Sequence, residues 1–98
     1  MVNIYNDGRK YYGHWKENHI DGFGEMNRIE GNKYIGYYKN DKKDGFGVYY
    51  SPQGIIFIGN WKKGKQDGFG KYINKNKIKY WIWNIGKIIK KKKRKWFL

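Results

Sequence analysis

The chain has 98 residues and a formal net charge of +14, contains no cysteine, and is 20% aromatic. That length supports one domain with a small core, and the lack of cysteine excludes disulfides and thiolate metal sites. No apolar run approaches the roughly 20 residues of a membrane span, and no N-terminal stretch resembles a signal peptide. We therefore expect an intracellular protein, either cytoplasmic or peripherally attached to the cytoplasmic face of a membrane.

In chain order, the first predicted element is a turn at residues 7–8, where glycine follows aspartate. A strand follows over residues 11–15, because strict alternation places its outer aromatic residues and the central glycine on one face. Asn18 then marks a tight turn, since asparagine tolerates left-handed backbone. A second strand runs over residues 21–26, so the first unit is a β-hairpin.

The same order of elements returns every 23 residues, with Asp-Gly-Phe-Gly beginning at Asp21, Asp44 and Asp67. A fixed short period identifies an array of similar units. A fourth unit begins one residue early and lacks the tetrapeptide. The residues that recur in phase are Gly13, Trp15, Gly22, Phe23 and Gly24 in the first unit, Gly36, Tyr38, Gly45, Phe46 and Gly47 in the second, Gly59, Trp61, Gly68, Phe69 and Gly70 in the third, and Trp83 in the fourth.

Two turns in each unit leave about five to seven residues for each strand, which is too short for a helix. We therefore predict an all-β fold in which residues 3–84 form about seven or eight antiparallel strands of one continuous sheet. A glycine between aromatic residues, such as Gly36 between Tyr34 and Tyr38, leaves a slot that we expect a neighbouring ring to fill. The core is then a stack of rings, with each hairpin burying its rings against the next.

The third unit carries the clearest motif, Ile-Gly-Asn-Trp-Lys-Lys-Gly at residues 58–64, followed by Gly68 and Gly70. It closely resembles the MORN (membrane occupation and recognition nexus) repeat, and the resemblance extends over roughly residues 6–87. The resemblance implies an elongated, twisted single-layer sheet of consecutive β-hairpins that serves as a scaffold or targeting module. Trp81 replaces the first glycine of the fourth copy, so we expect that copy to act as a terminal cap.

Positive charge is concentrated toward the C-terminus. Residues 1–67 carry 11 lysines and arginines against 8 acids, whereas residues 68–98 carry 11 and no acid. We divide the chain into a MORN-repeat array, residues 1–87, with three full repeats and a partial repeat at each end, and a basic, aromatic tail, residues 88–98. The candidate membrane-binding residues of the tail are Lys90, Lys91, Lys92, Lys93, Arg94, Lys95, Trp96 and Phe97.

Clustered cations beside aromatic side chains are typical of segments that bind anionic phospholipid membranes, because headgroups attract the cations and rings settle at the interface. The sequence thus predicts a non-catalytic adaptor that binds a protein partner, or itself, and associates peripherally with an anionic membrane. One alternative is a protein-interaction or dimerisation module whose tail is merely solvated. Another is a nuclear or nucleic-acid-associated protein, because the basic block also resembles a nuclear localisation signal.

No residue pattern points to catalysis, a metal or a cofactor. His14 and His19 have no cysteine or carboxylate at ligand spacing, so we expect both to be surface histidines. The aspartate of Asp-Gly-Phe-Gly recurs in each full unit, which favours a role in a turn or a hydrogen bond over a role as acid or base. Gly-Phe-Gly is not followed by the helix that phosphate-binding glycine loops require.

Overall fold

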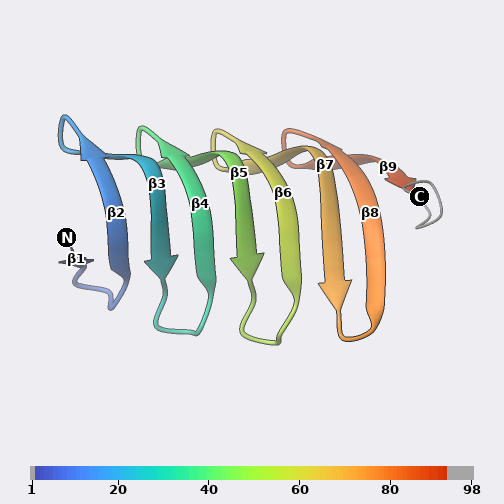
Figure 1. Cartoon of the computed structure of the whole chain (residues 1–98), viewed down its shortest axis with the longest axis horizontal. Helices are drawn as coiled ribbons and strands as arrows, with labels where there is room; N and C mark the ends of the chain where they lie inside the picture. Colours follow the sequence, from blue (N-terminus) through green and yellow to red (C-terminus); the bar gives the residue numbers. More distant parts are fainter. Residues whose placement is uncertain (1, 93–98) are drawn as a thin grey trace.

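A computed structural model describes residues 2–92, which form one antiparallel sheet of nine strands and no helix (Figure 1). The strands lie side by side in chain order, so every connection is a hairpin, and the molecule measures 42 × 26 × 21 Å. The strands are β1 (Val2–Ile4), β2 (Lys10–Lys16), β3 (His19–Asn27), β4 (Lys33–Lys39), β5 (Lys42–Tyr50), β6 (Ile56–Lys62), β7 (Lys65–Asn74), β8 (Lys77–Asn84) and β9 (Lys87–Lys92).

The predicted all-β hairpin array is confirmed, with eight strands, β1 to β8, between residues 2 and 84. The sheet then continues for one strand more, because β9 pairs with β8. β8 and β9 form the fourth copy, the last hairpin of the described sheet, and the backbone of Trp81 within it lies opposite Gly70 on one side and Lys91 on the other. β9 thus begins at the end of the predicted array and carries the sheet into the segment we assigned to the tail.

Each tight turn at one end of the hairpins has two successive residues in left-handed backbone. The φ angles are 66° at Asn18, 69° at Asp41 and 87° at both Gly64 and Gly86, which confirms the predicted turn position. The residue before each of these is left-handed too, and in the last turn it is Ile85, at 39°. Two such residues make a type I′ turn, whose twist matches the flanking strands.

The aspartate of Asp-Gly-Phe-Gly holds the tight turn of the next hairpin. Asp21 Oδ2 accepts a hydrogen bond from the backbone N–H of Asn40 at 3.3 Å, and Asp67 Oδ1 accepts one from Ile85 at 3.0 Å. Asp44 makes the corresponding bond in the unit between them. The predicted hydrogen-bonding role is confirmed, and these bonds tie successive hairpins together.

A row of six glycines crosses the middle of β2 to β7, each opposite the next across the sheet. Just past the glycine of β2, β4 and β6 the register shifts, as it does at a β-bulge, and bulges bend the strands that contain them. The strands therefore curve around one face of the sheet. The row consists of Gly13, Gly24, Gly36, Gly47, Gly59 and Gly70.

Aromatic rings cover this row so closely that the glycines have no room for a side chain. The ring of Tyr34 lies over Gly36 and Gly47, and Tyr11 and Phe57 lie in the same way one repeat earlier and one repeat later. The predicted slot is therefore filled by the ring two residues earlier on the same strand. We expected a neighbouring ring to fill it, and the ring that does so is one of the two that flank the glycine.

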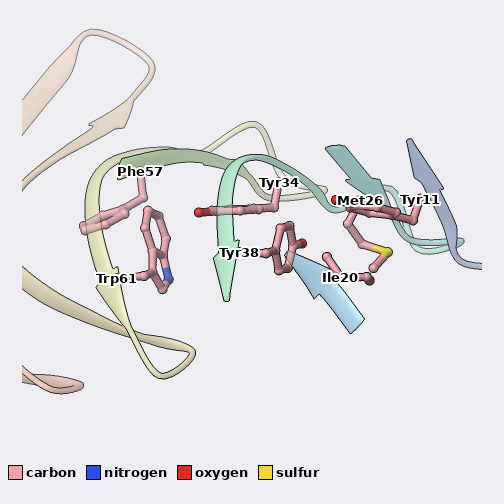
Figure 2. Packing of buried hydrophobic residues seen from close by; sticks show 7 residues of the cluster. All are labelled: Tyr11, Ile20, Met26, Tyr34, Tyr38, Phe57 and Trp61. Atoms are coloured by element: carbon pink, nitrogen blue, oxygen red, sulfur yellow. The ribbon is translucent and has the colours of Figure 1, made fainter. Parts of the chain in front are cut away.

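Edge-to-face ring contacts carry the core from one repeat to the next (Figure 2). Tyr38 lies 5.7 Å from Tyr11 of the preceding unit, and Trp61 lies 5.1 Å from Tyr34 in the same relation. The predicted stack of rings is confirmed. We call this face of the sheet the ring face and its opposite the outer face. The buried residues of the ring face are Tyr11, Ile20, Met26, Tyr34, Tyr38, Phe57 and Trp61.

Candidate functional site

The repeat positions predicted from sequence divide between the two faces. The glycine row and the buried rings belong to the ring face, whereas Phe23, Phe46 and Phe69 lie on the outer face with 48%, 52% and 41% exposure. Trp15 occupies the column of Tyr38 and Trp61 but is 38% exposed, because no full repeat precedes it. Trp83 packs on Phe57 at 6.1 Å. The first glycine of each tetrapeptide has positive φ: Gly22, Gly45 and Gly68, at 98°, 106° and 80°.

A pocket of about 180 Å³ opens on the ring face, and we call it the cationic pocket. The curvature of the strands brings both of their ends to it, since Arg28 comes from the β3–β4 loop and Lys43 from the start of β5 beside the opposite turn. The buried rings of Tyr34 and Tyr38, drawn in Figure 2, line it. Its charged lining residues are Arg9, Arg28, Lys33, Asp41, Lys42 and Lys43.

Three cations of this pocket, Arg28, Lys42 and Lys43, have no acidic partner among residues 2–92. Arg9 pairs with Asp7 at 2.8 Å and Lys33 lies 3.9 Å from Glu25, but neither Arg28 nor Lys43 forms an ion pair there. The ammonium nitrogen of Lys43 instead lies 5.3 Å from the centre of the Tyr34 ring. Burial, and then repulsion by Arg28, lower the pKa of Lys43 from its ordinary value.

The carboxylate of Asp41, which also lines the pocket, is already engaged. Its Oδ2 lies 2.6 Å from Nδ1 of His19, and its Oδ1 accepts the backbone N–H of Ile20 at 2.8 Å. His19 is exposed, as predicted, but the pairing was missed because its partner stands one repeat away. The hydrogen bond to Asp41 raises the pKa of His19, and the same bond lowers the pKa of Asp41.

The repeat itself does not require a cation at the positions of Arg28 and Lys43. At the position of Lys43 in the hairpin, the neighbouring repeats have the buried Ile20 and the neutral Gln66, each opposite the aromatic residue of its own turn. At the position of Arg28, the neighbouring repeats have Tyr5 and Ser51, which make the same loop hydrogen bonds. Arg28 and Lys43 therefore differ in charge from their counterparts in the neighbouring repeats. This difference is visible in the sequence, but our sequence prediction missed it.

A second pocket, of about 270 Å³, lies one repeat further along the ring face, and we call it the aromatic pocket. Ser51 and Gln66 stand in it where the cationic pocket has Arg28 and Lys43. The indole Nε1 of Trp83 is buried and has no hydrogen-bond partner within the described part of the chain. The pocket is lined by Tyr49, Ser51, Ile55, Phe57, Gln66, Tyr72, Trp81 and Trp83.

The predicted membrane-binding segment is only partly within the described residues. Lys90, Lys91 and Lys92 lie in β9, the last strand of the sheet, where their backbones pair with β8. The others, Lys93, Arg94, Lys95, Trp96 and Phe97, lie outside the described residues.

Residues 2–92 show no cluster of three or more histidine or acidic side chains placed to hold a metal ion. The same residues include no helix with the length and apolarity that crossing a membrane demands.

The fold and the paired pockets define a class: repeat proteins in which stacked β-hairpins form one extended surface. The MORN repeat model matches the chain three times, at residues 11–32, 34–55 and 57–77. The chain therefore belongs to the MORN repeat family, as its motifs predicted. No curated protein matches it in the comparison made.

Proposed function

We propose that this chain is a non-catalytic adaptor that binds protein partners through its MORN array and attaches peripherally to anionic membranes through its basic, aromatic C-terminus. MORN repeats are generally non-catalytic and often take part in protein or membrane interactions. The fold supports the adaptor role, because a single-layer sheet leaves both of its faces open to partners.

The distribution of charge carries the membrane part of the proposal. Residues 68–98 hold 11 lysines and arginines without one acid, and the basic block begins on β9, at the end of the sheet. Each cation near an anionic leaflet contributes about 1 kcal/mol, so the block of six provides at most about 6 kcal/mol before entropy costs. Such a tail supports reversible attachment.

The outer face supports the protein-binding part. Phe23, Phe46 and Phe69 recur along it at the repeat spacing, each about half exposed, and Tyr37 packs on Phe23 with ring centres 5.4 Å apart. Aromatic residues are enriched in protein interfaces, and exposed apolar surface of this kind marks interaction sites.

Co-sedimentation of the full chain with neutral and acidic vesicles tests the membrane role. Replacing residues 90–95 by glutamine should abolish binding to acidic vesicles. A control with the same loss of charge should retain most of the binding, because its lysines are exposed and scattered over the sheet. The control replaces Lys10, Lys16, Lys39, Lys62, Lys65 and Lys77 by glutamine.

The aromatic end of the tail distinguishes the membrane from a nucleic acid. Trp96→Ala with Phe97→Ala should weaken binding to acidic vesicles and leave a salt-sensitive remainder, since the cations still face the surface. A nuclear or nucleic-acid role predicts that the basic block is essential and that both rings are dispensable. Equal loss of vesicle binding in the block variant and in its charge-matched control would refute the role of the tail.

A further inference from the structure

We propose that the cationic and aromatic pockets form one groove for an acidic peptide. In this groove Arg28 and Lys43 bind a carboxylate, and the aromatic pocket beside Trp83 takes a large apolar side chain of the same peptide. The proposal rests on the protein-binding part of the proposed function, and it names the chemistry of the partner.

The first argument is that folding alone does not explain Arg28 and Lys43. The two cations come from opposite ends of the strands and converge on one cavity. They repel each other there, and neither has an acidic partner within residues 2–92. The equivalent positions of the next repeat hold Ser51 and Gln66, which complete the same hairpin without charge. Arg28 is exposed, whereas Lys43 is partly buried. An unpaired, partly buried cation costs free energy, and an anionic ligand would offset that cost.

The second argument concerns the aromatic pocket. It lies one repeat along the same face, lined by rings and by the aliphatic Ile55, and the one fully buried side-chain polar atom without a hydrogen-bond partner in the described residues is Nε1 of its Trp83. Apolar walls with few convergent polar groups are typical of ligand pockets. A large apolar side chain therefore fits this environment.

The third argument is the spacing of the pockets. One repeat is two strands, which places equivalent points about 10 Å apart. A peptide in polyproline II conformation has three residues per turn and rises about 3.1 Å per residue, so side chains three apart lie on one side about 9 Å from each other. The groove therefore fits an acidic residue separated by three positions from a large apolar residue.

Curvature favours a peptide over a membrane as the occupant. The strands bend around the ring face, so the turns and loops at their two ends rise on either side of both pockets. A bilayer is flat on the scale of this molecule and meets only such rims, whereas a single extended chain can lie between them. Two pockets in line also fit the side chains of one chain.

The probes are two blocked synthetic peptides, proline-glutamate-proline-proline-tryptophan-proline and its reverse, titrated into the isotope-labelled full chain and followed by NMR. We expect one order to bind and to shift the amide signals of Lys43 and Gln66 and the indole signal of Trp83. Replacing the glutamate by glutamine, or removing one of the central prolines, should weaken binding about tenfold or more.

The matched protein variant is Arg28→Ser with Lys43→Gln, which introduces the residues that the next repeat already has at these positions. It should lose peptide binding about tenfold or more while melting at least as high as the wild type. Lys16→Gln with Lys62→Gln removes the same charge from exposed sites and should change peptide affinity less than twofold, within the usual effect of distant surface charges.

Vesicle binding by the same variants separates this proposal from the role of the tail. The pocket variant should lose the peptide and keep acidic vesicles, and the variant neutralised at residues 90–95 should do the reverse. Loss of vesicle binding in the pocket variant would overturn the peptide assignment in favour of a lipid headgroup. Absence of binding by both peptides, or equal binding by the pocket variant, would also overturn it, whatever the vesicles show.

Discussion

The ring of Tyr34 lies against the α-carbon of Gly47 on the neighbouring strand. A Cβ atom built on Gly47 would stand 2.5 Å from both Cε1 and Cζ of this ring, which is far inside normal contact. The ring can lie there only because the opposite strand has no side chain at that point. Ring and glycine are therefore one packing unit, and the array repeats it with Tyr11 and Phe57.

A double-mutant cycle tests this unit. Gly47→Ala should destabilise the fold by roughly 1–3 kcal/mol or more, because the buried ring has to move. In a Tyr34→Leu background the same change should cost much less, since the ring that it strikes is gone. Chemical denaturation of the four proteins measures the coupling. Additive effects would show that the ring of Tyr34 is not what requires a glycine at position 47.

The last tight turn contains a strained residue. Ile85 has φ of 39° and is 45% exposed, and a β-branched residue is disfavoured in left-handed backbone. Ile85→Asn places the residue that the second hairpin has at this position, Asn40, and should stabilise the fold by about 0.5–1 kcal/mol. Ile4→Asn, also at an exposed isoleucine but in a strand, should give no gain in a thermal melt. A lower melting temperature for Ile85→Asn would contradict the strain.

Lys43→Gln should raise the melting temperature of the ligand-free protein at neutral pH. The lowered pKa of Lys43 in the wild type means that folding disfavours the charged lysine. The resulting loss of stability is fully present at pH values below the lowered pKa, and it disappears as the pH rises toward the ordinary lysine value of 10.5. The gain should shrink as the pH approaches that value, because the wild-type lysine then loses its proton. Lys62→Gln, at an exposed site, serves as control. A destabilised Lys43→Gln protein would mean that the lysine supports the fold rather than a ligand.

The His19 and Asp41 pair should make stability depend on pH in two windows. The raised pKa of His19 adds stability below its ordinary value of 6.5, and this is lost as the pH rises through the folded pKa. The lowered pKa of Asp41 adds stability above its ordinary 3.8, lost as the pH falls through the folded value. Asp41→Asn should return the His19 pKa toward 6.5 in an NMR titration. An unchanged titration would exclude the pair in solution.

The repeat made much of this fold predictable. Turn positions followed from residue types that tolerate left-handed backbone, as at Asn18 and Gly64, and the strand parity followed from alternation around Gly36. Alternation shows which side chains share a face of the sheet, but it does not show which face is buried. The half exposure of Phe46 could therefore not be predicted from the sequence. The position of the Tyr34 ring also depends on the bulge beside Gly36, and the residue types at this point of the strand do not predict a bulge.

The groove was harder to foresee. Arg28 and Lys43 stand 15 positions apart, and they meet only because the strands between them bend. Comparison of each repeat position with its counterparts would have singled out both residues, since Ser51 and Gln66 show what the hairpin needs there. His19 and Asp41 likewise belong to different hairpins, and only the stacking of adjacent turns brings their side chains together.

The most direct test of the proposed function is the binding of the full chain to acidic vesicles as a function of salt. Electrostatic attachment predicts binding to acidic but not neutral vesicles at low salt, and progressive release as added salt screens the charges of the tail. If the chain ignores acidic vesicles at low salt, the membrane role is wrong, and a protein-interaction module without membrane attachment takes its place.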